Sequence, residues 1–77
     1  MKSDMERVVK VVTEVLGVNE ALVTPSARFI EDLGASSLQS IEMVAAFEEE
    51  FDIEMDEDKA LVVQDVETAV TFIQEYL

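Results

Sequence analysis

Two adjacent serines, Ser36 and Ser37, are the side chains in this sequence best placed for covalent chemistry. They follow Gly34, which permits a tight turn ahead of a helix, and Ala35, whose small side chain is expected to leave the hydroxyls accessible. The sequence contains no histidine and no cysteine, so it offers no imidazole to activate a serine hydroxyl. A serine at this position is therefore predicted to be modified by another enzyme and not to be a catalytic nucleophile.

The spacing of Ser36 and Gln39 is that of a capping box, in which the serine oxygen accepts from the backbone N–H of Gln39 and the glutamine side chain reaches back. Ser36 is then the structural cap, and Ser37, at the first helical position, keeps a free hydroxyl. Local spacing alone also allows both serines to be ordinary capping residues. A helix N-terminus favours phosphate, and the nearby acidic residues favour a diester with one negative charge over a plain phosphate.

Three further segments must position these serines, and the first is an N-terminal helix. Ser3 and Glu6 form another capping box, and Gly17 is a typical helix end. Apolar residues between them recur at spacings of three and four, which predicts one buried stripe on an amphipathic helix. The stripe consists of Met5, Val8, Val9, Val12, Val15 and Leu16.

A long connection follows from Gly17 to Ala35, and long loops in small domains are usually functional. Its apolar residues are predicted to anchor it in the core, so that it holds the serine in place. These anchors are Leu22, Val23, Phe29, Ile30 and Leu33.

The second helix is predicted from Ser37 to about Phe51, with two apolar faces. The core face consists of Met43, Val44, Phe47 and Phe51. The second face consists of Leu38, Ile41 and Ala45, flanked by Glu42, Glu48 and Glu49. Either another part of the chain covers this second face, or it is a docking surface with an apolar centre and an acidic rim.

Two more helices complete the fold prediction. Asp56 is a suitable cap for a short helix that ends near Leu61, and Asp65 for a last helix. The buried stripe of that last helix is predicted to be Val66, Ala69, Val70, Ile73 and Leu77. The sequence therefore predicts an all-α fold, a small four-helix bundle of three longer helices and one short helix, with a long loop between the first two.

Composition restricts the partners and the location. The formal net charge is −13 over 77 residues, which disfavours binding to nucleic acid or to anionic membranes. Residues 29–58 contain eleven acidic residues and no lysine or arginine, so this block is expected to attract basic protein surfaces, although a solvated acidic face is the plainer interpretation. No apolar run is long enough to span a membrane, and the start lacks a secretion signal, so we expect a cytoplasmic monomer.

A calcium site is the main alternative for the acidic stretch. Asp52, Glu54 and Asp56 alternate as the first ligands of an EF-hand loop do. However, Glu57 occupies the position that needs glycine, and Val63 the position that needs a bidentate glutamate. We therefore predict no metal site.

Over nearly its whole length the chain resembles the acyl carrier proteins, small helical carriers on which fatty acids and polyketides are built. The resemblance rests on Glu6-Arg7-Val8, Leu16-Gly17-Val18, the run from Phe29 to Ala35, Ser37-Leu38, Glu42 and the run from Glu48 to Asp52. It implies that residues 1–77 form a single acyl carrier domain.

The resemblance also implies a function. Ser37 would receive a 4′-phosphopantetheine arm from coenzyme A through a phosphopantetheinyl transferase that uses magnesium. Acyl groups would then travel as thioesters for fatty acid, lipid or polyketide biosynthesis. The chain would be a non-catalytic carrier, and acyl-transferring, condensing or acyl-activating enzymes with basic patches would dock on its second helix. In the family, the bundle can also shelter an acyl chain.

This sequence departs from the family pattern beside the serine. Ser36 replaces the usual aspartate, Gln39 replaces a common acidic residue, and Ala45 is smaller than the usual aliphatic contact. These differences suggest a specialised carrier and not a housekeeping one. The alternatives are an acidic protein-interaction module without a prosthetic group, or a carrier of aminoacyl groups.

Overall fold

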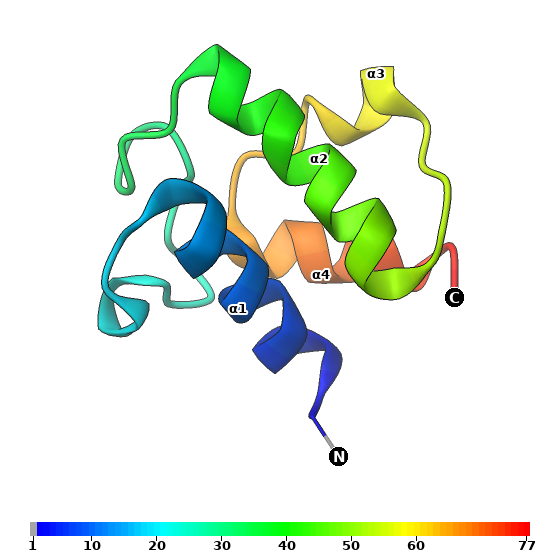
Figure 1. Cartoon of the computed structure of the whole chain (residues 1–77), viewed down its shortest axis with the longest axis horizontal. Coiled ribbons are helices and arrows are strands. Elements are labelled where there is room, and N and C mark those ends of the chain that lie inside the picture. The colour runs from blue at the N-terminus through cyan, green and yellow to red at the C-terminus, as the bar shows by residue number, and fades with distance from the viewer. Residues whose placement is uncertain (1) are drawn as a thin grey trace.

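Four α-helices build the structure, a computed structural model that describes residues 2–77; Met1, the first residue of the predicted domain, lies outside them. The helices are α1 (Asp4–Leu16), α2 (Ser37–Phe51), α3 (Glu57–Ala60) and α4 (Val66–Gln74), with a 3-10 turn η1 (Glu20–Leu22) in the long loop. Residues 2–77 contain no strand, only an isolated β-bridge between Arg28 and Asp65. The chain forms three longer helices and one short helix, with a long loop between the first two, and Figure 1 shows this arrangement. The fold prediction is therefore confirmed.

Helix α1 forms although it is rich in valine, because both of its ends are capped and its apolar face is buried. Ser3 and Glu6 make the reciprocal hydrogen bonds of a capping box, and Gly17 ends the helix with a φ of 65°. Val8 and Val12 are completely buried. Burial of this stripe outweighs the small helical disadvantage of β-branched residues.

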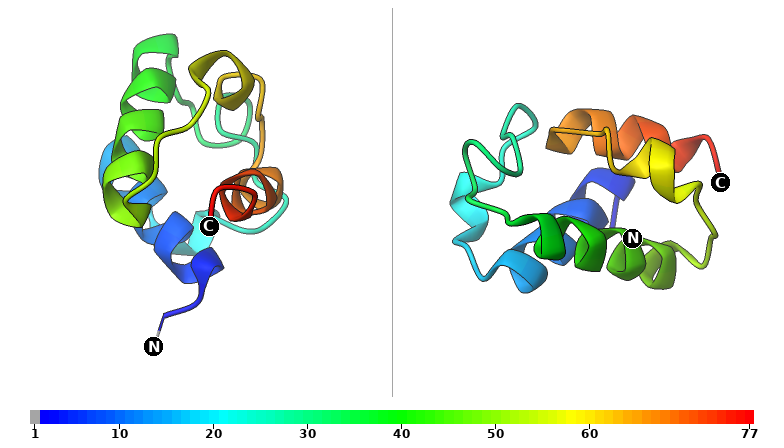
Figure 2. Two further views of the ribbon diagram at one scale, coloured as in Figure 1. Left: turned by 90° about the vertical axis from the view of Figure 1, so that its right-hand side faces the viewer. Right: turned by 90° about the horizontal axis from the view of Figure 1, so that it is seen from above.

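Helix α1 is the common packing partner of the two other long helices. It contacts both α2 and α4, and the two views in Figure 2 show the three long helices grouped around a common centre. The core contains the predicted inner face of α2 together with residues from every other long element. These buried residues are Val8, Val11, Val12, Val23, Ala27, Phe29, Leu33, Ala35, Met43, Val44, Phe47, Phe51, Met55, Val66, Ala69, Val70 and Ile73.

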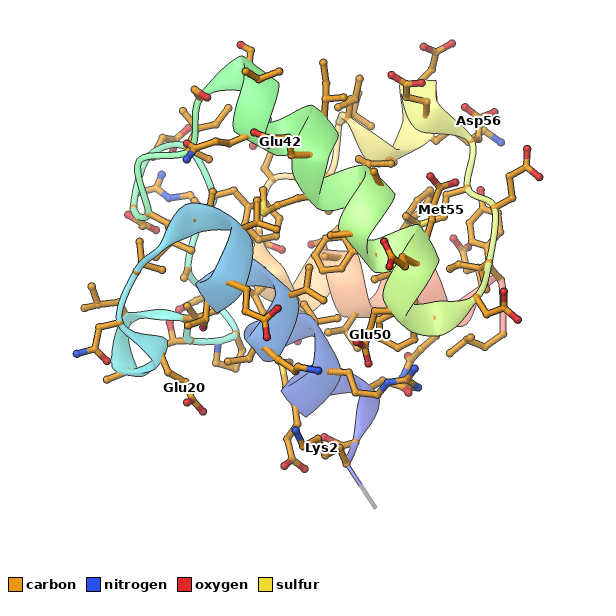
Figure 3. All side chains as sticks on the ribbon, in the orientation of Figure 1. Lys2, Glu20, Glu42, Glu50, Met55 and Asp56 are labelled. Atoms are coloured by element: carbon orange, nitrogen blue, oxygen red, sulfur yellow. The ribbon has the colours of Figure 1, made fainter. Side chains whose placement is uncertain are left out.

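A cluster of charged and aromatic groups joins α1 to the end of α2. Arg7 Nε lies 2.9 Å from Glu50 Oε2, and the same guanidinium donates to the Glu50 carbonyl oxygen. The Arg7 guanidinium carbon also lies 4.2 Å from the centroid of the Phe51 ring, and Lys10 Nζ lies 3.7 Å from Glu50 Oε1. Figure 3 labels Glu50 where α1 and α2 approach each other. These contacts make Arg7 a link between the two helices as well as a cap for the carbonyl end of α2.

This cluster predicts an acid-sensitive contribution to stability. The hydrogen bond from Arg7, assisted by attraction to Lys10, holds the pKa of Glu50 below its usual value. A carboxyl whose pKa is lowered by folding stabilises the fold above its unfolded-state pKa, and loses that contribution as pH falls through the folded-state value. We expect Glu50→Gln to unfold at lower urea than the unsubstituted chain at pH 7, and the gap to shrink as pH falls below the ordinary glutamate pKa of about 4.3.

Glu49→Gln is the matched control, because it removes the same charge from an exposed neighbour. It should be neutral or slightly stabilising at pH 7, since it relieves repulsion in a strongly acidic chain. Urea titrations at several pH values measure both variants. A gap for Glu50→Gln that stays constant from pH 7 to pH 3 would rule out this linkage.

The long loop is anchored by fewer residues than predicted. Val23, Phe29 and Leu33 are buried, but the predictions for Leu22 and Ile30 are wrong, since these side chains are 59% and 61% exposed. Leu22 ends the short η1 turn, and Ile30 follows Phe29 in a tight turn, where neighbouring side chains point to different sides.

Two small residues supply the remaining loop anchors. Ala27 and Ala35 are both 5% exposed. The loop also bonds to the start of α4: Phe29 N–H donates to the Gln64 carbonyl at 2.9 Å, and Val66 N–H donates to the Ala27 carbonyl at 3.1 Å. The small side chain of Ala35 therefore also serves close packing.

The predicted buried stripe of the last helix is wrong at its C-terminal end. Val66, Ala69, Val70 and Ile73 are buried as predicted, but Leu77 is 60% exposed. Helix α4 ends at Gln74, and the chain then turns, so Leu77 no longer follows the helical repeat.

Candidate functional site

The segment before α2 is held in place by a cluster of ion-paired side chains and by a glycine with a positive φ. Arg28 N–H donates to Asp32 Oδ2 at 2.8 Å, and the Arg28 side chain pairs with both Glu31 and Asp32. The hydrogen bond from the Arg28 side chain lowers the pKa of Asp32. Gly34 has a φ of 72°, which favours glycine, and Ala35 N–H donates to the Phe29 carbonyl at 2.9 Å. The chain therefore enters α2 in one defined direction.

Ser36 is the N-cap of α2, and its side chain is occupied. Its Oγ accepts from Gln39 N–H at 3.1 Å, and its own N–H donates to Gln39 Oε1 at 3.0 Å. Its carbonyl accepts from both the N–H and the hydroxyl of Ser40, at 2.9 Å and 3.1 Å. Gln39 thus closes the capping box without a charged side chain.

Ser37 is the first residue of α2, and its side chain is exposed. Within residues 2–77 its hydroxyl makes no hydrogen bond, in contrast to that of Ser36. The helix has no acidic residue in its first turn, so its N-terminal N–H groups and dipole favour an anion there. A hydroxyl that is reachable, unpaired and beside a helix N-terminus fits the attachment of a phosphodiester.

The outer face of α2 lies open. Leu38 and Ile41 are 67% and 46% exposed, and Glu42, Ala45 and Glu49 are exposed as well. No part of the chain between residues 2 and 77 covers the apolar centre of this face, which removes the alternative of a buried second stripe. We call Leu38, Ile41, Glu42, Ala45 and Glu49 the outer face of α2.

Glu48 lies at the edge of this outer face, three residues after Ala45 and seven after Ile41. It is half-buried, and its Oε2 accepts from Met55 N–H at 2.8 Å. Its carboxylate therefore holds the chain that leads into α3, a task that helical spacing did not indicate.

The inner face of α2 borders an apolar cavity of about 160 Å³. The cavity lies between α2 and α4, is bordered by the loop around Phe29 and by the chain from Met55 to Gln64, and is partly open to solvent. Apolar side chains make up most of its wall: Phe29, Ile30, Met43, Val44, Phe47, Met55, Ala60, Leu61, Val63, Ala69, Phe72 and Ile73. Helical periodicity assigns Met43, Val44, Phe47, Ala69 and Ile73 to buried stripes, but it does not show that they border a cavity.

Neither a membrane-spanning helix nor a metal-binding group of side chains is found in the described residues. The described part of the chain, residues 2–77, has no helix that is both long and apolar enough to cross a membrane. In the same residues, histidine, cysteine and acidic side chains form no group of three or more that is suited to a metal ion. The acidic residues of the calcium alternative therefore do not converge.

The structure is an all-α bundle with an exposed serine at the start of α2 and an apolar cavity along the inner face of the same helix. Residues 6–73 match the family model described as the phosphopantetheine attachment site, so the chain belongs to this family. It is also similar to the acyl carrier protein of Phenylobacterium zucineum (strain HLK1), with 53% identity over 77 residues that cover 100% of this chain and 98% of the relative. The resemblance to acyl carrier proteins is thereby confirmed, and the cofactor of this fold is phosphopantetheine.

Proposed function

We propose that Ser37 Oγ is the attachment point of 4′-phosphopantetheine and that the chain carries acyl groups for fatty acid, lipid or polyketide biosynthesis. The observation that carries the proposal is the division of labour between the two serines: Ser36 is occupied as the cap, whereas Ser37 is exposed and unpaired. Once attached, the group supplies the thiol that the sequence lacks, on which acyl groups are held as thioesters.

In the loading reaction the chain is a substrate. A bond forms between Ser37 Oγ and a phosphorus of coenzyme A, the pyrophosphate bond breaks, and adenosine 3′,5′-bisphosphate leaves. The chain has no histidine to accept the hydroxyl proton, so the transferase must supply the base. The chain provides the fixed helix start and N–H groups that favour the new phosphodiester. We therefore propose a carrier and not a catalyst.

The test is the intact mass of the chain after incubation with coenzyme A, magnesium and a phosphopantetheinyl transferase. We expect one phosphopantetheinyl group to be added. An unchanged mass would contradict the carrier role and favour an acidic interaction module. Loading the holo form with acyl and with aminoacyl groups by candidate partner enzymes then distinguishes the two kinds of cargo.

We further propose the outer face of α2 as the docking surface for the transferase and for acyl-transferring, condensing or acyl-activating enzymes. Its apolar centre suits contact with a partner, and Glu42 and Glu49 suit basic patches. Charge attraction of this kind accelerates encounter and weakens with salt.

Charge reversal on this surface should slow loading. For Glu42→Lys we expect kcat/KM of the transferase to fall by about tenfold at low salt, because steering by opposite charge is lost. Glu20→Lys is the matched control, since Glu20 is exposed at the η1 turn, and Figure 3 shows it well away from Glu42. Rates measured at rising ionic strength should converge for the two variants. Salt-independent rates for the unsubstituted chain would exclude steering.

The cavity supports an acyl cargo over a purely interactive role. An apolar cavity of about 150 Å³ holds a molecule the size of benzene, so a space of this size accepts about six carbons without expansion. Its position along the inner face of α2, the helix that begins with Ser37, suits a shelter for the acyl group.

Three positions support a specialised member of the family. Ser36 and Gln39 complete the capping box without the charge that the family usually places there, and Ala45 is exposed in the docking surface. We propose that the transferase and partners of this chain recognise an uncharged approach to Ser37.

A further inference from the structure

One wall of the cavity differs from the others in how it is held. Residues 55–64, which we call the α3 strap, contribute Met55, Ala60, Leu61, Val63 and Gln64 to the lining. Helix α3 itself buries no side chain. Within the described chain, the backbone N–H groups of Lys59, Ala60, Leu61 and Val63 donate only to acceptors inside the strap. The middle of this wall is therefore held to the rest of the bundle by the side-chain packing of Ala60 and Val63 and not by backbone hydrogen bonds.

The strap is fixed mainly at its ends. At the far end, the Gln64 carbonyl accepts from Phe29 N–H at 2.9 Å, a backbone bond. At the near end, side chains make the bonds: Met55 N–H donates to Glu48 Oε2 at 2.8 Å, and Asp56 N–H donates to Tyr76 Oη at 3.1 Å. Figure 1 shows the C-terminal tail beside the chain that leads into α3, and Figure 3 labels Met55 and Asp56 there.

Tyr76 is itself positioned by the cavity wall. Its ring meets that of Phe72 edge to face, with 5.3 Å between the centroids, and Phe72 lines the cavity. The hydroxyl therefore connects the strap to α4 through one aromatic pair. Loss of that hydroxyl leaves the ring contact intact and frees only the strap.

We propose that Tyr76 is a positioning residue that, with Glu48, latches the α3 strap over the cavity and so determines how readily an apolar cargo leaves its shelter. The part of this inference that concerns cargo rests on the proposed acyl carrier function. Opening breaks two side-chain hydrogen bonds at the near end and exposes part of the buried Met55 side chain, while the backbone bond at Gln64 remains as the pivot.

The first test uses the unmodified chain and measures amide hydrogen exchange residue by residue. In Tyr76→Phe, which keeps the ring, the amides of Met55 and Asp56, whose acceptors lie outside the strap, should exchange about fivefold faster, as expected for one lost hydrogen bond. Glu48→Ala should accelerate the same amides, and Glu49→Ala, its matched control, should not. Unchanged exchange in the strap would overturn the latch, as would equal acceleration throughout α1 and α2, which reports general destabilisation.

The second test uses the chain loaded at Ser37 with an octanoyl or an acetyl group. In Tyr76→Phe, hydroxylamine should cleave the octanoyl thioester severalfold faster than in the unsubstituted chain, whereas the acetyl thioester, too short to need shelter, should react at the same rate. Equal octanoyl rates in a chain that is loaded normally would refute the latch alone. A chain that cannot be loaded at Ser37 refutes the carrier proposal, and the exchange test still applies.

Discussion

The Ser37→Ala chain will keep its original mass after incubation with coenzyme A and a phosphopantetheinyl transferase, while the unsubstituted chain gains one phosphopantetheinyl group. The substitution removes the only oxygen that the proposed phosphodiester uses. The fold should remain intact, because the Ser37 side chain is exposed and makes no hydrogen bond within residues 2–77. Circular dichroism and urea unfolding of the variant check that point, so that loss of modification is not loss of structure.

Ser36→Ala is the matched control on the neighbouring hydroxyl. It removes the Ser36 Oγ that accepts from Gln39 N–H, and N-cap losses of this kind destabilise a protein by about 1 kcal/mol. We expect this variant to be modified fully but more slowly, because the start of α2 frays. A mass gain in Ser37→Ala, or none in a folded Ser36→Ala, would reverse the roles assigned to the two serines.

Ile73→Ala should produce the largest loss of stability among these substitutions. Ile73 is 1% exposed and lines the cavity, so the substitution removes buried methyl groups and enlarges an existing space. Such changes cost about 2–5 kcal/mol, a large share of the roughly 5–15 kcal/mol available to a whole domain. The melting temperature should fall by roughly 4–8 °C for each kcal/mol lost.

Leu77→Ala provides the comparison, because helical periodicity places Leu77 on the same stripe as Ile73. The structure leaves Leu77 exposed beyond the end of α4, so its loss should change the free energy of unfolding by less than about 0.5 kcal/mol. Thermal and urea unfolding of both variants measure the difference. Similar losses for Ile73→Ala and Leu77→Ala would mean that α4 continues to the end of the chain in solution.

The helices could be predicted from sequence because their signals are local. Ser3, Ser36, Asp56 and Asp65 lie within three residues of the N–H groups that they cap, and Gly17 marks its helix end through its own φ. The inner face of α2 follows from angular spacing alone. These features need no knowledge of what lies opposite.

The features that sequence did not reveal depend on residues far apart in the chain. Arg7 and Glu50 are 43 residues apart, and Asp56 and Tyr76 are 20 residues apart, with α3 and α4 between them. A polar residue on a helix gives no sign of such a partner. In the loop, Ile30 and Leu22 looked like anchors because they are aliphatic, but turn geometry and not residue type determines which side chains face inward.

The candidate site was partly predictable for the same reason. The capping spacing of Ser36 and Gln39 separated the two serines in advance, since a capping box involves only four residues. The exposure of the outer face of α2 could be learned only from the structure, because amphipathic spacing is the same whether or not another element covers that face. The cavity required the structure as well, since its wall combines residues from the long loop, α2, the chain from Met55 to Gln64 and α4.

In the proposed function, three parts of helix α2 contact three different molecules. Its first residue is the proposed site of the prosthetic group, its inner face borders the cavity, and its outer face is open to partners. A tilt of α2 that makes room for an acyl group in the cavity must also displace Leu38 and Ile41 on the outer face. If partner enzymes dock on Leu38 and Ile41, as proposed above, they would contact side chains whose position depends on whether the cavity is empty or filled.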